Sequence, residues 1–266
     1  MDRRPPVRSS EAIRGPSASP LALALLTLLA LTPLSAADWP AYMHDNLRSG
    51  VTQEQLQLPL KRVWVHKPAV PPQPAWTGPA KWDAYAGIKG LRSMRDFDPG
   101  YYVTAVGGEV YFGSSGDDAV HCIDASTGAV RWSFFTDGPV RVPPSWQDGK
   151  LYFGSDDGCA YCVDAPSGAL VWKHRPSASG RLIPSNGKLI SPWPVRTGVL
   201  VQDGKAYFAA SLLPWEESYL CAVEAQTGGD SGEGLYKVVC AEVTMQGAML
   251  ASDSNLYVLQ GRSAPL

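Results

Sequence analysis

The densest group of residues capable of chemistry is the run Asp156–Cys162, which reads Asp-Asp-Gly-Cys-Ala-Tyr-Cys. Two cysteines separated by two residues form half of a zinc site or a redox pair. A second such pair, or two histidines at ligand spacing, would complete a zinc site, and the sequence has neither. On a β-strand, residues three apart point to opposite faces. The sequence therefore favours a structural role for Cys159 and Cys162 over a metal or redox role.

Other catalytic patterns are equally sparse. The chain contains no Gly-x-Ser-x-Gly, no His-Glu-x-x-His and no phosphate-binding P-loop. Its four histidines, at positions 44, 66, 121 and 174, are scattered, and His121 is interpreted as a structural histidine on a strand. No catalytic residue is assigned from the sequence, and enzymatic activity is not favoured.

The surrounding sequence explains the cysteine pair, because it is one unit written twice. Tyr111–Trp132 and Tyr152–Trp172 share an opening Tyr-Phe-Gly-Ser, a central Asp, a Gly and a closing Trp. Cys122 and Cys162 both lie two residues before the repeated Asp, as expected of a small buried residue at one strand position. A period near 40 residues in a strand-rich sequence indicates propeller blades or a similar repeat array.

Turn residues divide each copy into four short strands. In the second copy they are expected at residues 140–146, 151–154, 159–164 and 170–174, and the Asp-Gly pairs between them suit the positive φ of tight hairpins. A looser third copy lacks the closing Trp and carries insertions at about 175–195 and 211–217. The predicted fold is all-β, an incomplete β-propeller of four-stranded antiparallel blades. The blades are placed at about 99–136, 139–176 and 195–240, with a partial blade at 243–266.

Within the copies, residues 122–132 and 162–172 resemble the tryptophan-docking motif of quinoprotein-type propellers, roughly Ala-x-Asp-x-x-Thr-Gly-x-x-x-Trp. Both have Cys for Ala, and the second also has Ser for Thr. The resemblance is to pyrroloquinoline quinone (PQQ)-like propeller repeat proteins, which are typically eight-bladed. Three and a half blades cannot close such a ring. We therefore expect a fragment of a longer propeller; termini that pair with another chain are the alternative.

The repeated motif has a structural explanation. The Asp accepts backbone N–H groups of the following turn, the Gly supplies a positive φ, and the Trp packs flat against the neighbouring blade with its indole N–H bonded. These roles are assigned to six residues: Asp124, Gly128, Trp132, Asp164, Gly168 and Trp172.

Two arginines repeat without being required by the blade. Arg141 and Arg196 each follow a Pro-Val pair and each precede the Tyr of the next copy by 11 residues. They should therefore enter the innermost strand of successive blades, beside the central channel. Guanidinium groups bind carboxylate or phosphate, so the pair is a candidate anion-binding site. The alternative is that each arginine caps a carbonyl or pairs with a neighbouring Asp.

In the enzymes that the motif resembles, PQQ lies on a calcium ion in the channel, often beside a disulfide between adjacent cysteines. This sequence has no adjacent cysteines, and no set of oxygen ligands can be matched to the calcium site. No cofactor or metal is therefore expected; PQQ and Ca²⁺ enter only if the chain is a quinoprotein oxidoreductase or a piece of one.

The N-terminal third is organised differently. Four arginines, the apolar run Leu21–Leu31 and the small residues before Ala37 have the layout of a secretory signal peptide, assigned to residues 1–37, and an uncleaved anchor is the alternative. No lipobox Cys and no second apolar run of spanning length follow. Residues 38–98 are interpreted as an arm, one strand at 61–66 and a Pro-rich connection. The expected location is secreted or periplasmic.

Charge restricts the partners. The formal net charge is −2, and it becomes −4 without residues 1–37, which hold four arginines and two acidic residues. No basic stripe supports nucleic-acid binding. The leading hypothesis is an exported, non-enzymatic propeller that binds a protein or saccharide. The alternatives are a quinoprotein oxidoreductase and a propeller attached to a separate enzymatic domain.

Overall fold

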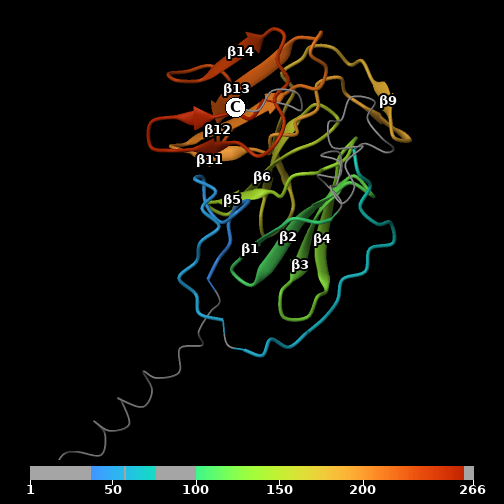
Figure 1. Ribbon diagram of the computed structural model, residues 1–266, viewed down its shortest axis with the longest axis vertical. Coiled ribbons are helices and arrows are strands. Elements are labelled where there is room, and N and C mark those ends of the chain that lie inside the picture. Colours follow the sequence, from blue (N-terminus) through green and yellow to red (C-terminus); the bar gives the residue numbers. More distant parts are fainter. Residues whose placement is uncertain (1–36, 57, 76–99, 261–266) are drawn as a thin grey trace, which may run out of the picture. The chain divides into compact units, whose positions relative to one another are not determined.

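All regular secondary structure is β-strand in the computed structural model, which describes residues 37–56, 58–75 and 100–260. Three four-stranded antiparallel sheets follow one another along the chain, each with its strands in sequence order (Figure 1). The first contains β1 (Val103–Val106), β2 (Glu109–Ser114), β3 (Ala119–Asp124) and β4 (Val130–Phe135). The second contains β5 (Ser145–Gln147), β6 (Lys150–Gly154), β7 (Ala160–Asp164) and β8 (Leu170–His174). The third contains β11 (Leu200–Gln202), β12 (Lys205–Ala210), β13 (Ser218–Glu224) and β14 (Tyr236–Cys240).

Two smaller sheets complete the description. One hairpin, β9 (Ile183–Ser185) with β10 (Lys188–Ile190), lies between the second and third blades, and a second, β15 (Leu250–Ala251) with β16 (Leu256–Tyr257), follows the third. The prediction of an incomplete propeller of four-stranded blades is thereby confirmed.

The tight turns follow from the residues at their centres. Asp148 and Gly149, between β5 and β6, have φ of 49° and 75°. Asp203 and Gly204, at the same place in the third blade, have φ of 51° and 73°. Two successive positive φ values define the type I′ hairpin, whose twist matches that of the flanking strands. The Asp-Gly pairs thus fix the register of the first two strands in each of these blades.

The core lies between the blades. One buried cluster joins the first two blades, and it includes Tyr111, Cys122, Phe153 and Val163. A second joins the second blade to the third and to β15, and it includes Trp172. The third strands β3 and β7 are buried at nearly every position, and Cys122 and Cys162 on these strands are fully buried.

Two local predictions need correction. The strand expected at 140–146 is reduced to Ser145–Gln147, because Pro143 and Pro144 cannot donate ladder hydrogen bonds. Residues 61–66 are not assigned to a strand. The insertion predicted at 175–195 is present, and it holds the β9–β10 hairpin around Asn186 and Gly187, an Asn-Gly pair with φ of 47° and 81°.

The N-terminal arm connects the blades. Trp39 exchanges two backbone hydrogen bonds with Ala105 of β1, at 2.6 and 2.9 Å, and the Pro40 carbonyl accepts one from β5. The Asn46 side chain donates to β11 at 2.8 Å, and its carbonyl accepts from β15. The arm therefore contacts the first strand of four of the five sheets, satisfying backbone groups at edges that would otherwise be unpaired.

The signal-peptide prediction falls almost wholly on residues outside the described ranges, as does much of the Pro-rich connection. Among residues 37–56, 58–75 and 100–260, no helix has the length and hydropathy needed to cross a membrane.

Candidate functional site: a buried arginine–aspartate cluster

The two repeated arginines meet at one end of the blades. Arg141 precedes β5, Arg196 precedes β11, and Asp156 lies two residues after the end of β6. In an antiparallel blade, the start of the first strand and the end of the second strand lie at the same end of the sheet. The repeat therefore brings these three side chains together from two adjacent blades.

Both guanidinium groups bind the same carboxylate. Arg141 Nε lies 2.7 Å from Asp156 Oδ2, while Arg196 donates from Nε to Oδ1 at 2.7 Å and from Nη2 to Oδ2 at 2.8 Å. The three side chains are only 5%, 2% and 1% exposed. Arg141 also donates to the Gln73 carbonyl at 2.7 Å. The arrangement is a bidentate ion pair from Arg196 and a second, single contact from Arg141.

The cluster keeps its charges although it is buried. Desolvation alone would raise the pKa of Asp156, but Arg196 and Arg141 outweigh it and hold that pKa below its ordinary value. Of the two sequence interpretations, pairing with a neighbouring Asp is the one that the contacts display. Binding of an external anion by Arg141 and Arg196 remains a prediction.

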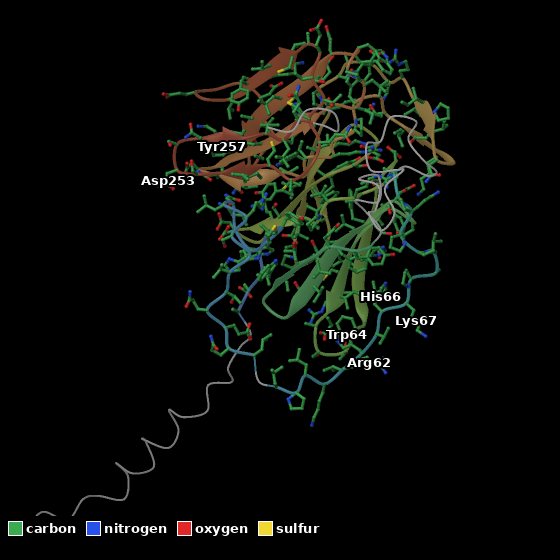
Figure 2. All side chains as sticks on the ribbon, viewed as in Figure 1. Arg62, Trp64, His66, Lys67, Asp253 and Tyr257 are labelled. Carbon is green, nitrogen blue, oxygen red and sulfur yellow. The ribbon has the colours of Figure 1, made fainter. Side chains whose placement is uncertain are left out.

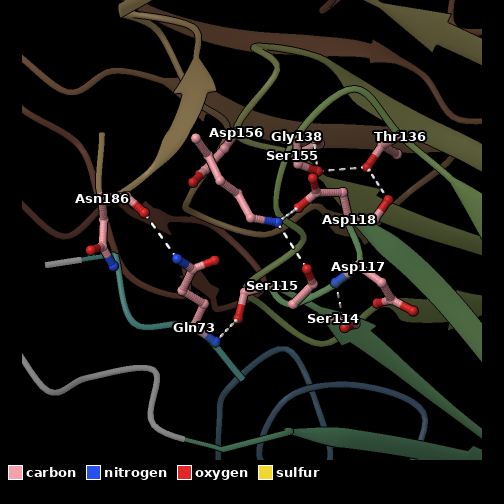
Figure 3. Close-up of polar contacts among 12 residues, drawn as sticks. Gln73, Ser114, Ser115, Asp117, Asp118, Thr136, Gly138, Ser155, Asp156 and Asn186 are labelled. Atoms are coloured by element: carbon pink, nitrogen blue, oxygen red, sulfur yellow. Dashed lines mark hydrogen bonds and ion pairs between the residues drawn. The ribbon is translucent and has the colours of Figure 1, made fainter. Parts of the chain in front are cut away.

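A second ion pair extends the cluster toward the first blade. Lys188 of β10 pairs with Asp118 in the β2–β3 turn and donates to the Gly116 carbonyl at 3.0 Å. Gln73 Nε2 donates to the Asn186 carbonyl at 2.9 Å, and its backbone N–H donates to Ser115 Oγ at 2.9 Å (Figure 3). The β9–β10 hairpin therefore bridges the first blade and the segment around residue 73. This contact was not predicted from the sequence, although the Asn-Gly pair was a signal for the hairpin.

The first blade also carries a Ser-His-Asp relay. His121 Nδ1 lies 2.8 Å from Ser133 Oγ, and its Nε2 lies 3.0 Å from Asp117 Oδ2. A hydrolase triad joins the same three residue types through the opposite ring nitrogens, with Ser on Nε2 and Asp on Nδ1. In the second blade, however, the equivalent positions hold Asp157, Tyr161 and Lys173, which also contact one another. Since the relay recurs with groups that cannot act as a serine nucleophile, we interpret it as a polar part of the blade, in line with the structural role predicted for His121.

The cysteines are buried thiols. All five are free, and four of them are fully buried: Cys122, Cys159, Cys162 and Cys221. Burial raises the pKa of Cys159 to about 11 and that of Cys162 to about 12. Reactive and metal-binding cysteines are thiolates with a lowered pKa. The pKa of the Cys159 and Cys162 thiols is instead raised, as expected of buried structural cysteines.

The tryptophans of the motif pack against glycines of the next blade. Trp132 Nε1 donates to the Ala165 carbonyl at 3.0 Å, and a Cβ added to Gly168 would lie 2.7 Å from the Trp132 ring. Trp172 repeats this contact on the third blade, where it donates to Ala225 at 2.8 Å. Gly168 has a φ of 71°. It is therefore required twice, for its conformation and for the close approach of the indole.

The aspartates of the motif organise the turns that receive these tryptophans. Asp124 Oδ1 accepts the backbone N–H of Ser126 and of Thr127, both at 3.0 Å, and Asp164 accepts that of Ser167 at 3.0 Å. Hydrogen bonds from Ser126, Arg131 and Thr127 hold the pKa of Asp124 well below its usual range.

A further docking tryptophan lies outside the blades. Trp64 Nε1 donates to the Ala125 carbonyl at 2.7 Å, and its ring covers Gly128. The segment around it runs beside the first sheet (Figure 2). Residues 64–68 and 172–176 share the pattern Trp-x-His-basic-Pro. This shared pattern is the sequence signal for the additional docking tryptophan. The segment thus supplies the contact that a preceding blade would make.

The aromatic residue two positions after each docking Trp also packs on the next blade. His66, Phe134 and His174 contact the Phe of the Tyr-Phe pair in the following sheet, with ring centroids 5.3 to 5.9 Å apart. The repeat is therefore longer than the motif, and it includes a second inter-blade contact.

The described carboxylates do not fit a calcium ion. Within residues 37–56, 58–75 and 100–260, no three His, Cys, Asp or Glu side chains lie close enough together to hold a metal. Asp156 is bonded to two arginines, and Asp118 is bonded to Lys188. Calcium requires six or more oxygen ligands that converge. The carboxylate oxygens of Asp156 and Asp118 at this end of the blades are already bonded to cationic side chains.

Two cavities flank the N-terminal arm instead. They have volumes of about 560 and 360 Å³ and share Asp45 and Asn46. None of the residues singled out by the sequence analysis as a candidate anion site or blade motif lines either of them.

Comparison with known proteins agrees with the blade geometry. A family model described as outer membrane protein assembly factor BamB matches residues 62–230 and 135–262. No curated protein matches the chain.

Among solved structures, the quinohemoprotein alcohol dehydrogenase from Comamonas testosteroni is similar over 88% of this chain, with a TM-score of 0.61 and 16% identity. The quinohemoprotein alcohol dehydrogenase ADHIIG from Pseudomonas putida HK5 gives a TM-score of 0.47 at 18% identity, over 60% of this chain. BamB from Moraxella catarrhalis gives 0.28 at 13% identity, over 60% of this chain and 79% of its own.

This chain spans 37% of the Comamonas enzyme and 28% of the Pseudomonas one. The likeness to the Comamonas enzyme concerns the fold. Together with a family model that covers most of the sequence, it shows that the chain belongs to the PQQ-like propeller repeat family, whose matching model is that of the outer membrane protein assembly factor BamB.

Proposed function

We propose that this chain is an exported, non-enzymatic propeller module that binds and positions a protein or saccharide partner. The observation that carries the proposal is the Arg141–Asp156–Arg196 cluster. Its charged groups, which a ligand or cofactor would need, are buried and bonded to one another. The docking tryptophans and buried thiols likewise serve the contacts between blades. The charged, aromatic and thiol groups of the repeat thus serve to hold the blades rigidly together.

Export to the periplasm or the cell exterior is part of the proposal. It is supported by the arginine-rich start and the apolar run Leu21–Leu31, and by the family description as an outer membrane protein assembly factor. A nucleic-acid partner is not proposed, because the chain carries a small net negative charge.

Added PQQ and Ca²⁺ are expected to leave the melting temperature of the purified chain unchanged. A ligand that binds only the folded state raises the free energy of unfolding, by about 2.7 kcal/mol at 100 times its Kd. The melting temperature therefore rises with the ligand concentration. The measurement is a thermal unfolding series at increasing PQQ with excess Ca²⁺, and a matched series with Ca²⁺ alone. A melting temperature that rises with PQQ concentration would contradict the proposal and support the quinoprotein alternative.

A further inference from the structure

The third blade departs from the repeat at two places, and these two departures meet. The first is the segment 175–195, which contains the β9–β10 hairpin, and the second is the β12–β13 connection at 211–217. Arg181 Nη2 in the first lies 2.6 Å from Glu216 Oε1 in the second. The first two blades lack both segments and still form complete sheets. This contact is therefore not required by the blade fold.

The Arg181–Glu216 ion pair lies against a buried aromatic ring, that of Trp193. The Arg181 guanidinium lies 5.3 Å from the centre of the Trp193 ring, and Trp193 is 7% exposed. Trp193 packs edge-on against Tyr219 at 6.3 Å, and the Tyr219 hydroxyl donates to Glu217 Oε2 at 2.8 Å. Arg181, Glu216 and Glu217 thus have defined positions, which lowers the entropy cost of ordering them around a ligand.

Trp215 directly precedes Glu216 in the chain, and its side chain is exposed to solvent. Its exposure is 76%, the highest of the exposed aromatic side chains in the described part of the chain. A backbone hydrogen bond from Glu216 N–H to the Leu213 carbonyl, at 3.0 Å, closes the turn that carries it. The turn thus holds a large aromatic side chain out in solvent next to Glu216.

We propose that Trp215, with Arg181, Glu216 and Glu217, forms a platform that binds a neutral saccharide. The flat indole face matches the C–H face of a pyranose ring, while the flanking carboxylates and guanidinium hydrogen-bond its hydroxyl groups. Two Glu and one Arg give the platform a net charge of −1, which disfavours anionic ligands. The inference rests on the proposed binding function and names the class of its partner.

The test uses the full 266-residue chain labelled with 5-fluorotryptophan and observed by ¹⁹F NMR. Cellohexaose, chitohexaose and maltohexaose are titrated separately. We expect the Trp215 resonance, assigned with Trp215→Phe, to shift saturably with at least one hexasaccharide, with a Kd of about 0.1–1 mM. Trp215→Ala should weaken binding at least about tenfold, measured by calorimetry. Phe135→Ala removes another exposed aromatic residue, 66% exposed on β4, and should not change the affinity.

Three outcomes would overturn the platform: no response to any hexasaccharide at roughly 10 mM, equal binding by the Trp215→Ala variant, or a purified protein partner that requires Trp215 while the saccharides do not bind. The last outcome would assign the surface to a protein. The PQQ experiment remains separate, because stabilisation by PQQ would refute the non-enzymatic function without a change at Trp215.

Discussion

Asp156→Ala is expected to lower the free energy of unfolding by about 3–5 kcal/mol, because it leaves two buried guanidinium groups without their shared carboxylate. Arg141 and Arg196 cannot lose their charge at accessible pH. The Gln73 carbonyl, which Arg141 also contacts, is neutral and does not replace the lost charge. The measurement is urea unfolding at neutral pH, with Asp253→Ala as the control. Asp253 is exposed, so its substitution should change stability by less than about 0.5 kcal/mol.

A charge-free version of the cluster separates charge from packing. The triple variant Arg141→Met, Asp156→Leu, Arg196→Met removes all three charges together and keeps apolar volume. It should lose less stability than Asp156→Ala alone, because no unpaired charge is left in the interior. If the triple variant is the less stable of the two, the cost of the single substitution does not arise from unpaired arginines.

The Asp156 carboxylate also predicts a loss of stability at low pH. The pKa of Asp156 is lowered in the folded protein, so its contribution to stability is present above the unfolded-state value near 4 and is lost as pH falls through the folded-state value. Wild-type stability should therefore decline with acidification below about pH 4 more steeply than that of Asp156→Ala.

Trp172→Ala is expected to cost about 3–5 kcal/mol, the range for removing a large buried aromatic side chain. Trp172 is 6% exposed, donates to Ala225 and fills the space beside Gly228. Trp64→Ala should cost less, because Trp64 is only half-buried and docks on a single turn. Trp215→Ala is the matched control, since the exposed indole packs little.

Urea unfolding of the three variants checks the order of their effects. Equal losses for Trp64 and Trp172 would mean that the N-terminal segment is bound as firmly as a blade. No loss for Trp64 would mean that its contact with Gly128 does not stabilise the first blade in solution.

The blades were predictable because each depends on local signals. Asp-Gly turns, alternating apolar positions and the repeated Trp predict four strands within about 35 residues. Comparison of the copies then distinguished structural residues of the blade from candidate functional residues. The same comparison assigned Cys162 to the core. The shortened β5 was also readable, since its cause is the pair Pro143-Pro144.

The contacts between distant segments were not predictable from the repeat. Arg141 and Arg196 could be matched to each other by spacing, but their shared partner Asp156 follows a different strand. The contacts of the N-terminal arm with four inner strands, and that of Lys188 with Asp118, depend on how the blades stack. A single sequence gives no signal for how the blades stack, apart from the matching Trp-x-His-basic-Pro segments.

The central claim is that Asp156 is the resident anion of the two arginines. It is tested most directly by formate rescue of the Asp156→Ala variant, with sodium chloride at equal ionic strength as the control. We expect formate to raise the melting temperature of the variant by several degrees, about 1 kcal/mol of recovered stability or more, and to leave the wild type unchanged. If formate or phosphate stabilises the wild type as much as the variant, Arg141 and Arg196 bind an external anion and the cluster is a ligand site.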